Sequence, residues 1–129
     1  MKPAKEARVQ LDAEVSSLGQ ARRFVRRTLL DWTVDESRIE PAQLVATELV
    51  ANAIVHALSP PVLSLEALGS ELVLRVADRS RKLPVTREAT TDAAGGRGLL
   101  IVDALADRWG VDESGTGKVV WVAFENAFR

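Results

Sequence analysis

The spacing of hydrophobic residues in the first half of this chain predicts two helices. One begins at Ser16 or Ser17, either of which can cap it, and runs to about Trp32. A second opens near Pro41, since proline is well tolerated in the first turn of a helix, and stops before the Ser-Pro-Pro at residues 59–61. The second helix is hydrophobic over most of its circumference, so we expect it to be buried.

Alternating hydrophobic and polar residues predict strands, most of them in the second half. The expected elements besides the two helices are a short strand at residues 8–11, a hairpin at 62–67 and 71–77, a helix at about 99–107, and strands at 108–111 and 119–124. Between the hairpin and the third helix, residues 79–96 form a polar loop. A loop of that length in a small domain is usually functional or mobile.

This order of elements predicts an α/β (α+β) fold. Helices that cluster before hairpins are typical of a two-layer sandwich, in which a mostly antiparallel mixed sheet is covered on one face by about three helices. At 129 residues the chain is most simply one domain. We place that domain at residues 8–129, behind a flexible leader at residues 1–7.

Composition narrows the functional classes. The 17 Lys and Arg residues nearly balance the 18 Asp and Glu residues, which argues against direct binding of nucleic acid. The absence of cysteine excludes disulfides, thiolate metal sites and cysteine nucleophiles. No apolar run approaches the ~20 residues that a membrane span requires, and the N-terminus lacks the apolar stretch of a signal peptide. The expectation is a soluble cytoplasmic protein that does not bind membranes.

Glu48, Asn52 and His56 are the most informative polar residues, because they recur every four positions along the second predicted helix. They therefore stack along one of its faces. A buried carboxylate or amide costs on the order of a few kcal/mol unless it is paired, and Mg²⁺ with bound phosphates is one partner that offsets this cost. A satisfied network with neighbouring backbone groups explains the spacing equally well.

Asp78 follows an apolar strand, and its carboxylate could accept a hydrogen bond from an exocyclic amine. Taken alone, aspartate in this position more often starts a turn. Further along, the glycines of residues 95–98 open the third predicted helix, where backbone N–H groups and the helix dipole favour an anion. Arg97 could add a contact to a terminal phosphate. A hinge without a ligand is the alternative, and the spacing fits neither the Walker nor the Rossmann motif.

Taken in order, these three segments resemble the GHKL or Bergerat-fold ATPases, which include the ATP-binding domains of gyrase, Hsp90, histidine kinases and MutL. Residues 47–56 resemble the N box of that superfamily, Asp78 the G1 aspartate and residues 96–102 the G2 box. The resemblance covers about residues 40–125. The short chain, the Asn-Ala-x-x-His form of the N box and the last strand at 117–124 most resemble one branch, the stand-alone anti-sigma factor serine/threonine kinases.

The resemblance implies a role for each of these residues. Asn52 would ligate Mg²⁺, Asp78 would bind the adenine amine, and Glu48 would be the general base that activates a serine hydroxyl of a partner protein. The lid over the phosphates of ATP would be formed by Gly96, Arg97, Gly98 and Leu99. ATP and Mg²⁺ are therefore the implied cofactors. The set is chemically sufficient, because phosphoryl transfer needs mainly positioning, a metal, charge, and one carboxylate to orient the nucleophile.

The segment after Asp78 departs from the superfamily pattern. Where the superfamily commonly has Asp-x-Gly-x-Gly, residues 78–84 read Asp-Arg-Ser-Arg-Lys-Leu-Pro and contain no glycine. The leading interpretation is an ATP-binding regulatory protein that phosphorylates a serine of an antagonist protein and sequesters a sigma factor. The glycine-free segment favours the alternative, a nucleotide-responsive protein-binding module without kinase activity.

Expected partners also follow from the resemblance: a sigma factor, an antagonist (anti-anti-sigma) protein, and a second copy of the chain in a homodimer. Four arginines on the first predicted helix form either a solvated face or a docking surface for an acidic partner. They are Arg22, Arg23, Arg26 and Arg27. We do not expect His56 to accept a phosphoryl group, because it lies one turn beyond Asn52, where we expect it to pack or bond locally near the helix end. A sensor histidine kinase also needs an upstream dimerisation helix with its own histidine, and residues 1–40 contain none.

Overall fold

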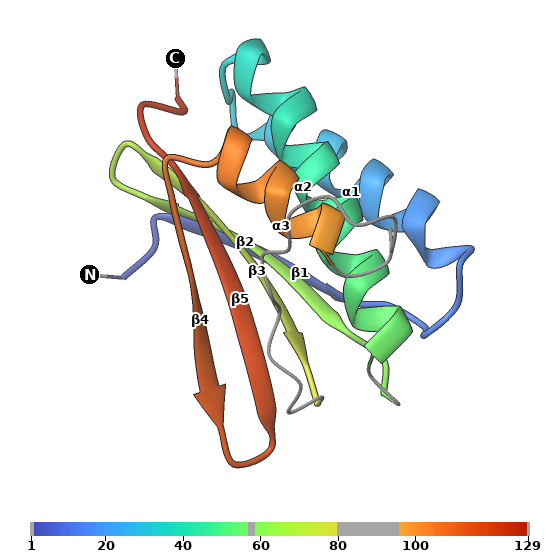
Figure 1. Cartoon of the computed structure of the whole chain (residues 1–129). Helices are drawn as coiled ribbons and strands as arrows, with labels where there is room; N and C mark the ends of the chain where they lie inside the picture. The colour runs from blue at the N-terminus through green and yellow to red at the C-terminus, as the bar shows by residue number, and fades with distance from the viewer. Residues whose placement is uncertain (1, 57–58, 80–95, 129) are drawn as a thin grey trace.

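The computed structural model describes residues 2–56, 59–79 and 96–128, and these fold into two layers (Figure 1). In this described part, a five-stranded antiparallel sheet forms one layer and three helices on one face of it form the other. The elements are β1 (Lys5–Gln10), α1 (Ser17–Asp31), α2 (Glu36–His56), β2 (Val62–Leu68), β3 (Glu71–Asp78), α3 (Gly96–Leu105), β4 (Arg108–Ser114) and β5 (Gly117–Phe124). The fold class expected from the sequence is confirmed.

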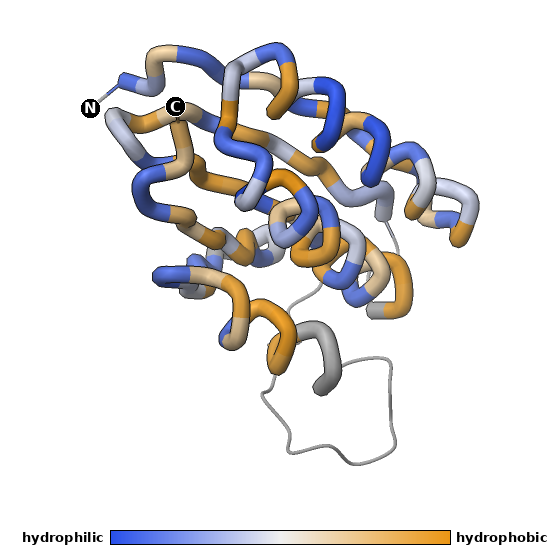
Figure 2. The backbone as a smooth tube through the Cα atoms, turned by 90° about the horizontal axis from the view of Figure 1, so that it is seen from above, coloured by the Kyte–Doolittle hydropathy of each residue, from blue (hydrophilic) through white to orange (hydrophobic). Residues whose placement is uncertain are grey.

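The central strand of the sheet is β3. The strand order is β1-β2-β3-β5-β4, and every neighbouring pair is antiparallel. Among the helices, α2 contacts both α1 and α3, and the view from above shows it between them (Figure 2). Because α2 also packs on β3, the central helix covers the central strand.

The first strand is longer than the sequence pattern predicted. β1 begins at Lys5, and Lys5 and Ala7 pair with Ala67 and Leu65 of β2. Ala7 packs against the core, as Val9 does, so the period of two begins before residue 8. The prediction of a flexible leader over residues 1–7 is therefore wrong for residues 5–7.

The second helix begins earlier than expected. Its start at Glu36 lies ahead of Pro41, near which the sequence pattern placed it. The Oδ1 atom of Asp35 accepts hydrogen bonds from the backbone N–H of Ser37 at 2.9 Å and from its hydroxyl at 2.7 Å, so Asp35 caps the helix. Pro41 is accommodated inside α2, where it removes only one backbone hydrogen bond.

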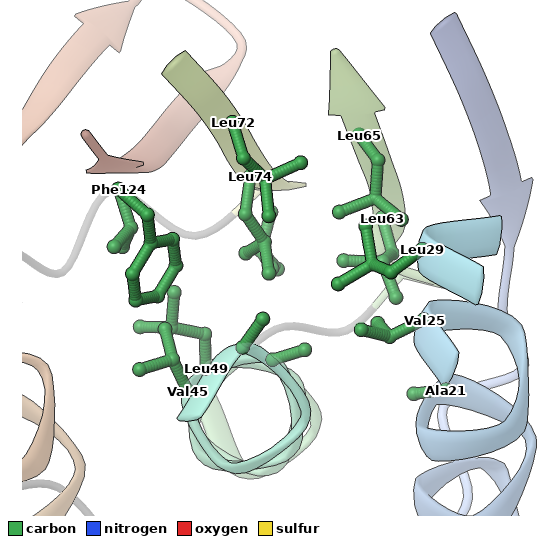
Figure 3. Close-up of a cluster of buried hydrophobic side chains, with 14 of the residues drawn as sticks. Ala21, Val25, Leu29, Val45, Leu49, Leu63, Leu65, Leu72, Leu74 and Phe124 are labelled. Atoms are coloured by element: carbon green, nitrogen blue, oxygen red, sulfur yellow. The ribbon is translucent and has the colours of Figure 1, made fainter. Parts of the chain in front are cut away.

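The hydrophobic core lies between the sheet and the helices α1 and α2 (Figure 3). The labelled side chains that meet there are Ala21, Val25 and Leu29 from α1, Val45 and Leu49 from α2, and Leu63, Leu65, Leu72, Leu74 and Phe124 from the sheet. Each fully buried leucine stabilises the fold by about 1.5–3 kcal/mol. The helix-facing residues of β3 and β5 are therefore held in fixed positions right up to the strand ends.

The opposite face of the sheet carries an ion pair between Arg75 and Glu66 and one large aromatic side chain. Trp121 alternates with the core residues Val120 and Val122, so it lies on the face without helices. A Cβ on Gly110, its partner on β4, would come within 2.7 Å of the Trp121 ring, so glycine leaves room for the indole. The Arg108 guanidinium lies 5.9 Å from the centre of the same ring, within range of a cation–π contact.

Among the described residues, no helix has the length and hydrophobicity needed to cross a membrane.

Candidate functional site

The helix that carries Glu48 and Asn52 packs against both of the other elements with candidate chemistry. The C-terminal end of α2 and the tip of β3 lie on the same side of the structure (Figure 1). α2 contacts both β3, which ends at Asp78, and α3, which begins at Gly96. The polar loop expected at residues 79–96 falls almost wholly outside the described residues.

Asn52 presents a buried atom with an unmet hydrogen bond. Its Oδ1 has almost no exposure to water and no hydrogen-bond partner among the described residues. An unsatisfied buried acceptor costs roughly 1–3 kcal/mol. For this atom, the satisfied polar network considered as the alternative is not found in the described part of the chain. A side-chain carbonyl oxygen is also a suitable ligand for Mg²⁺, so the residue fits that ion.

Other polar residues of α2 behave differently. The Thr47 hydroxyl donates to the backbone carbonyl of Gln43 at 2.7 Å, and the Gln43 side chain donates to the carbonyl of Arg22 on α1 at 3.1 Å. These contacts tie α2 to its own backbone and to α1. Glu48 lies one turn before Asn52, is partly exposed, and makes no hydrogen bond or ion pair with another described residue. It is therefore accessible to a substrate group.

Asp78 forms a buried ion pair that the sequence analysis did not anticipate. The Nζ atom of Lys118 on β5 lies 3.0 Å from Oδ1 and 3.1 Å from Oδ2 of Asp78. The side chains of Lys118 and Asp78 are only 8% and 3% exposed. The two residues are direct neighbours across the β3–β5 pairing, and both follow the period of the core residues onto the face that the helices cover. A turn residue in water would have no such partner.

A sequence signal for Lys118 existed. Lys118 continues the alternation of Val120 and Val122, so the period of two already placed it on the buried face of β5. What the pattern could not supply was the identity of the neighbouring strand, because β3 and β5 are separated by a helix and another strand in the sequence.

Gly117 allows the close approach of β5 to Asp78. A Cβ at this position would lie 2.0 Å from the carbonyl oxygen of Asp78 and 2.7 Å from the Cα of Arg79. Both are backbone atoms, which cannot rotate away as a side chain can. Only glycine at residue 117 allows the two backbones to lie this close beside Asp78. Gly117 is, after Lys118, the second residue near Asp78 whose role the sequence analysis did not predict.

The start of α3 supplies the last candidate residues. Gly96, Arg97 and Gly98 lie in its first turn, and the helix begins earlier than the expected residue 99. The surroundings of these three side chains lie outside what the structure describes. Leu99 is fully buried, whereas the next residue, Leu100, is 39% exposed. The N-terminus of a helix offers free backbone N–H groups, which are suited to phosphate.

No group of three or more His, Asp or Glu side chains is placed to hold a metal ion within the described ranges. The fit of this site to Mg²⁺ therefore rests on the Asn52 carbonyl oxygen, with the remaining ligands supplied by phosphate oxygens and water in the way typical of that ion.

The model of the family described as histidine kinase-like ATPase domain matches residues 11–124. The chain belongs to this family. The match includes α1, α2, β3, α3 and β5, and with them every residue of the candidate site. The resemblance to the histidine-kinase-like ATPases stated from the sequence motifs is thereby confirmed at the level of the family.

Two solved structures show the same fold as this histidine kinase-like ATPase domain. One is described as the RsbU and RsbW domains of Rv1364c from Mycobacterium tuberculosis, with 20% identity and a TM-score of 0.73 over 95% of this chain and 33% of that chain. The other is the Acinetobacter baumannii histidine kinase AdeS, with 16% identity and a TM-score of 0.53 over 92% of this chain and 67% of that one. The chain spans about a third of the RsbU–RsbW chain. No curated protein sequence matches it.

Proposed function

We propose that this histidine kinase-like ATPase domain binds Mg-ATP and acts as a protein serine/threonine kinase of the anti-sigma type. Its substrate would be a serine of an antagonist protein, and a sigma factor would be its second partner. The observation that carries the proposal is the buried Oδ1 of Asn52, which has no partner among the described residues, on the helix that packs on β3. In a family of ATPase domains, such an atom is best explained as a ligand for the metal that accompanies ATP.

Each candidate residue would contact a different part of the nucleotide. Asn52 would hold the metal, and Asp78 would accept a hydrogen bond from the adenine amine. Backbone N–H groups in the first turn of α3, together with Arg97, would bind the phosphates. Bound Mg-ATP supplies the phosphoryl group and a metal that neutralises its charge.

Glu48 would position the acceptor. Its carboxylate lies one turn before Asn52 on the same face of α2 and is partly exposed, so it can reach a serine hydroxyl brought in by a partner. It would accept the hydroxyl proton as the serine oxygen forms its bond to phosphorus and ADP departs. The anti-sigma branch itself is supported by the sequence form of residues 52–56 and of the last strand.

A second function is favoured by two observations at the base end of the site. Residues 79–84 contain no glycine, and the Asp78 carboxylate is already paired with Lys118. These features favour a nucleotide-responsive protein-binding module without kinase activity. Phosphoserine on a co-purifying partner after incubation with Mg-ATP would count against this second candidate.

The test of the leading proposal is calorimetric titration of Mg-ATP into the wild type and Asn52→Ala. We expect binding that requires magnesium, and a loss of affinity of at least about tenfold in the variant, as for other groups that support a bound metal. Thr47→Val is the matched control, because the Thr47 hydroxyl bonds only to its own helix. Equal affinity with and without magnesium, or in Asn52→Ala and the wild type, would contradict the proposal.

A further inference from the structure

The Asp78–Lys118 ion pair occupies the place that the proposed function gives to the nucleobase. Both carboxylate oxygens of Asp78 lie within 3.1 Å of the Lys118 ammonium, and both side chains are almost wholly buried. Charged groups leave water at a high free-energy cost, so a buried pair of this kind persists only because each charge satisfies the other. A ligand that donates a hydrogen bond to Asp78 must therefore compete with Lys118.

We infer that Lys118 controls how the site selects its base: in the nucleotide-free protein it holds Asp78, and a base with an exocyclic amine must compete with it for the carboxylate. Lys118 thereby lowers the affinity for adenine nucleotides and weakens the preference for a 6-amino base over a 6-oxo base. The inference rests on the proposed function, because it assumes that a nucleotide places its base at Asp78.

The lysine side chain is the part of this arrangement that can move. The backbone of β5 is pressed against the backbone of Asp78 and Arg79 at Gly117, so the strand has no room to shift toward them. Lysine carries its charge on a flexible four-carbon stem, and Lys118 is the second residue of β5, just after the exposed residues Gly115 and Thr116. The exchange therefore requires a rotation of the Lys118 stem and no movement of the strand.

The charge of Lys118 explains why the exchange would depend on the base. The adenine amine of ATP can donate to Asp78 in place of the ammonium, and an oxo group at the same ring position cannot. While the ammonium remains bound to Asp78, a 6-oxo base binds with nearly the same affinity as a 6-amino base, because the carboxylate already has a donor. Inosine triphosphate carries an oxo group at this position and a hydrogen on the neighbouring ring nitrogen N1, and is otherwise identical to ATP, so it tests the base end while the triphosphate end stays constant.

The experiment is calorimetric titration of Mg-ATP and Mg-ITP into the wild type and Lys118→Gln, whose side chain is one bond shorter and keeps an N–H donor group but removes the charge. We expect the affinity for ATP to rise roughly tenfold in the variant, as a competing charge-assisted hydrogen bond is weakened, and the affinity for ITP to stay within about twofold. Lys5→Gln, an exposed lysine on β1, is the matched control and should change neither affinity.

The outcomes separate this inference from the proposed function. Magnesium-dependent binding of both triphosphates, with the same ratio of affinities in the wild type and Lys118→Gln, overturns the inference alone. A fall in the affinity for ATP in the variant overturns it as well. Failure of every folded variant to bind either triphosphate overturns the proposed function and this inference with it. If circular dichroism shows that Lys118→Gln does not fold, Lys118→Thr is titrated against the same criterion.

Discussion

Gln43 and Asn52 are both amides on α2, and their surroundings distinguish a structural residue from a candidate ligand. The Gln43 amide donates to the carbonyl of Arg22 and so joins two helices, whereas Asn52 Oδ1 has no partner among the described residues. The sequence pattern marked Asn52 as a residue of interest but could not separate the two cases, because hydrogen-bond satisfaction depends on tertiary neighbours.

At the same scale, Glu48 is expected to act in the chemical step and not in binding. In Glu48→Gln we expect phosphotransfer from ATP to a serine-bearing partner to fall by about 10²–10⁴-fold, the usual contribution of a positioned general base. Affinity for Mg-ATP should stay within about twofold, because the neutral amide keeps the shape of the side chain. Radiolabel transfer and calorimetry measure the two quantities separately.

Glu40→Gln is the control for this variant, because Glu40 is exposed on the same helix and lies outside the candidate site. Undiminished phosphotransfer in Glu48→Gln would remove Glu48 from the mechanism and leave the rest of the site as proposed.

At the scale of elements, the sequence predicted which segments are helices and strands better than where they begin. The core-facing period of α1 and of the β2–β3 hairpin was strong enough to place both. The start of α2 was misplaced because Pro41 is a conspicuous signal, whereas the cap by Asp35 depends on side-chain geometry. The pairing of β3 with β5, and with it the Asp78–Lys118 contact, could not be predicted because strand order is a tertiary property.

The close approach of β5 to the end of β3 makes a prediction about stability. Gly117→Ala places a methyl group 2.0 Å from the Asp78 carbonyl oxygen, so we expect it to lower the free energy of unfolding by about 1–3 kcal/mol. Gly115→Ala in the same hairpin is the control, since a Cβ there meets no atom within 4 Å, and we expect a change of no more than about 0.5 kcal/mol. Urea denaturation of the two variants measures the difference, and equal stabilities would show that the contact relaxes freely.

At the scale of the whole molecule, the helix layer and the open face of the sheet present different surfaces to a partner. The outer side of α1 carries the four exposed arginines, and Arg75 pairs with Glu66 on the open sheet face. A groove of about 520 Å³ runs beside that pair and includes Arg8 and Glu6 among its lining residues. Positive charge therefore dominates the exposed face of α1, whereas the groove contains both signs.

An acidic partner is accordingly expected to dock on α1. The double variant Arg23→Glu/Arg27→Glu should weaken binding of an acidic sigma factor or antagonist roughly tenfold or more, mainly through slower association at low salt. Affinity for Mg-ATP should not change, because both arginines are exposed on α1 and neither belongs to the candidate site. Surface plasmon resonance at two salt concentrations measures the effect.

Arg8→Glu, an exposed reversal of charge on β1, is the control for the docking variant. If it weakens partner binding as much as the α1 double variant does, then the net charge of the molecule, and not the α1 surface, governs the association.

The position of β3 at the centre of the sheet has a consequence for how the chain folds. The β2–β3 hairpin can form locally, but the other edge of β3 stays unpaired until β5 arrives, and Asp78 and Lys118 are 40 residues apart. Such non-local pairing is intrinsically slow. Until it occurs, the unpaired N–H and C=O groups along one edge of the apolar strand β3 are a template on which another chain can add a strand. The first measurable effect of substitutions in the β4–β5 hairpin should therefore be aggregation during refolding, which should appear before any defect in ligand binding.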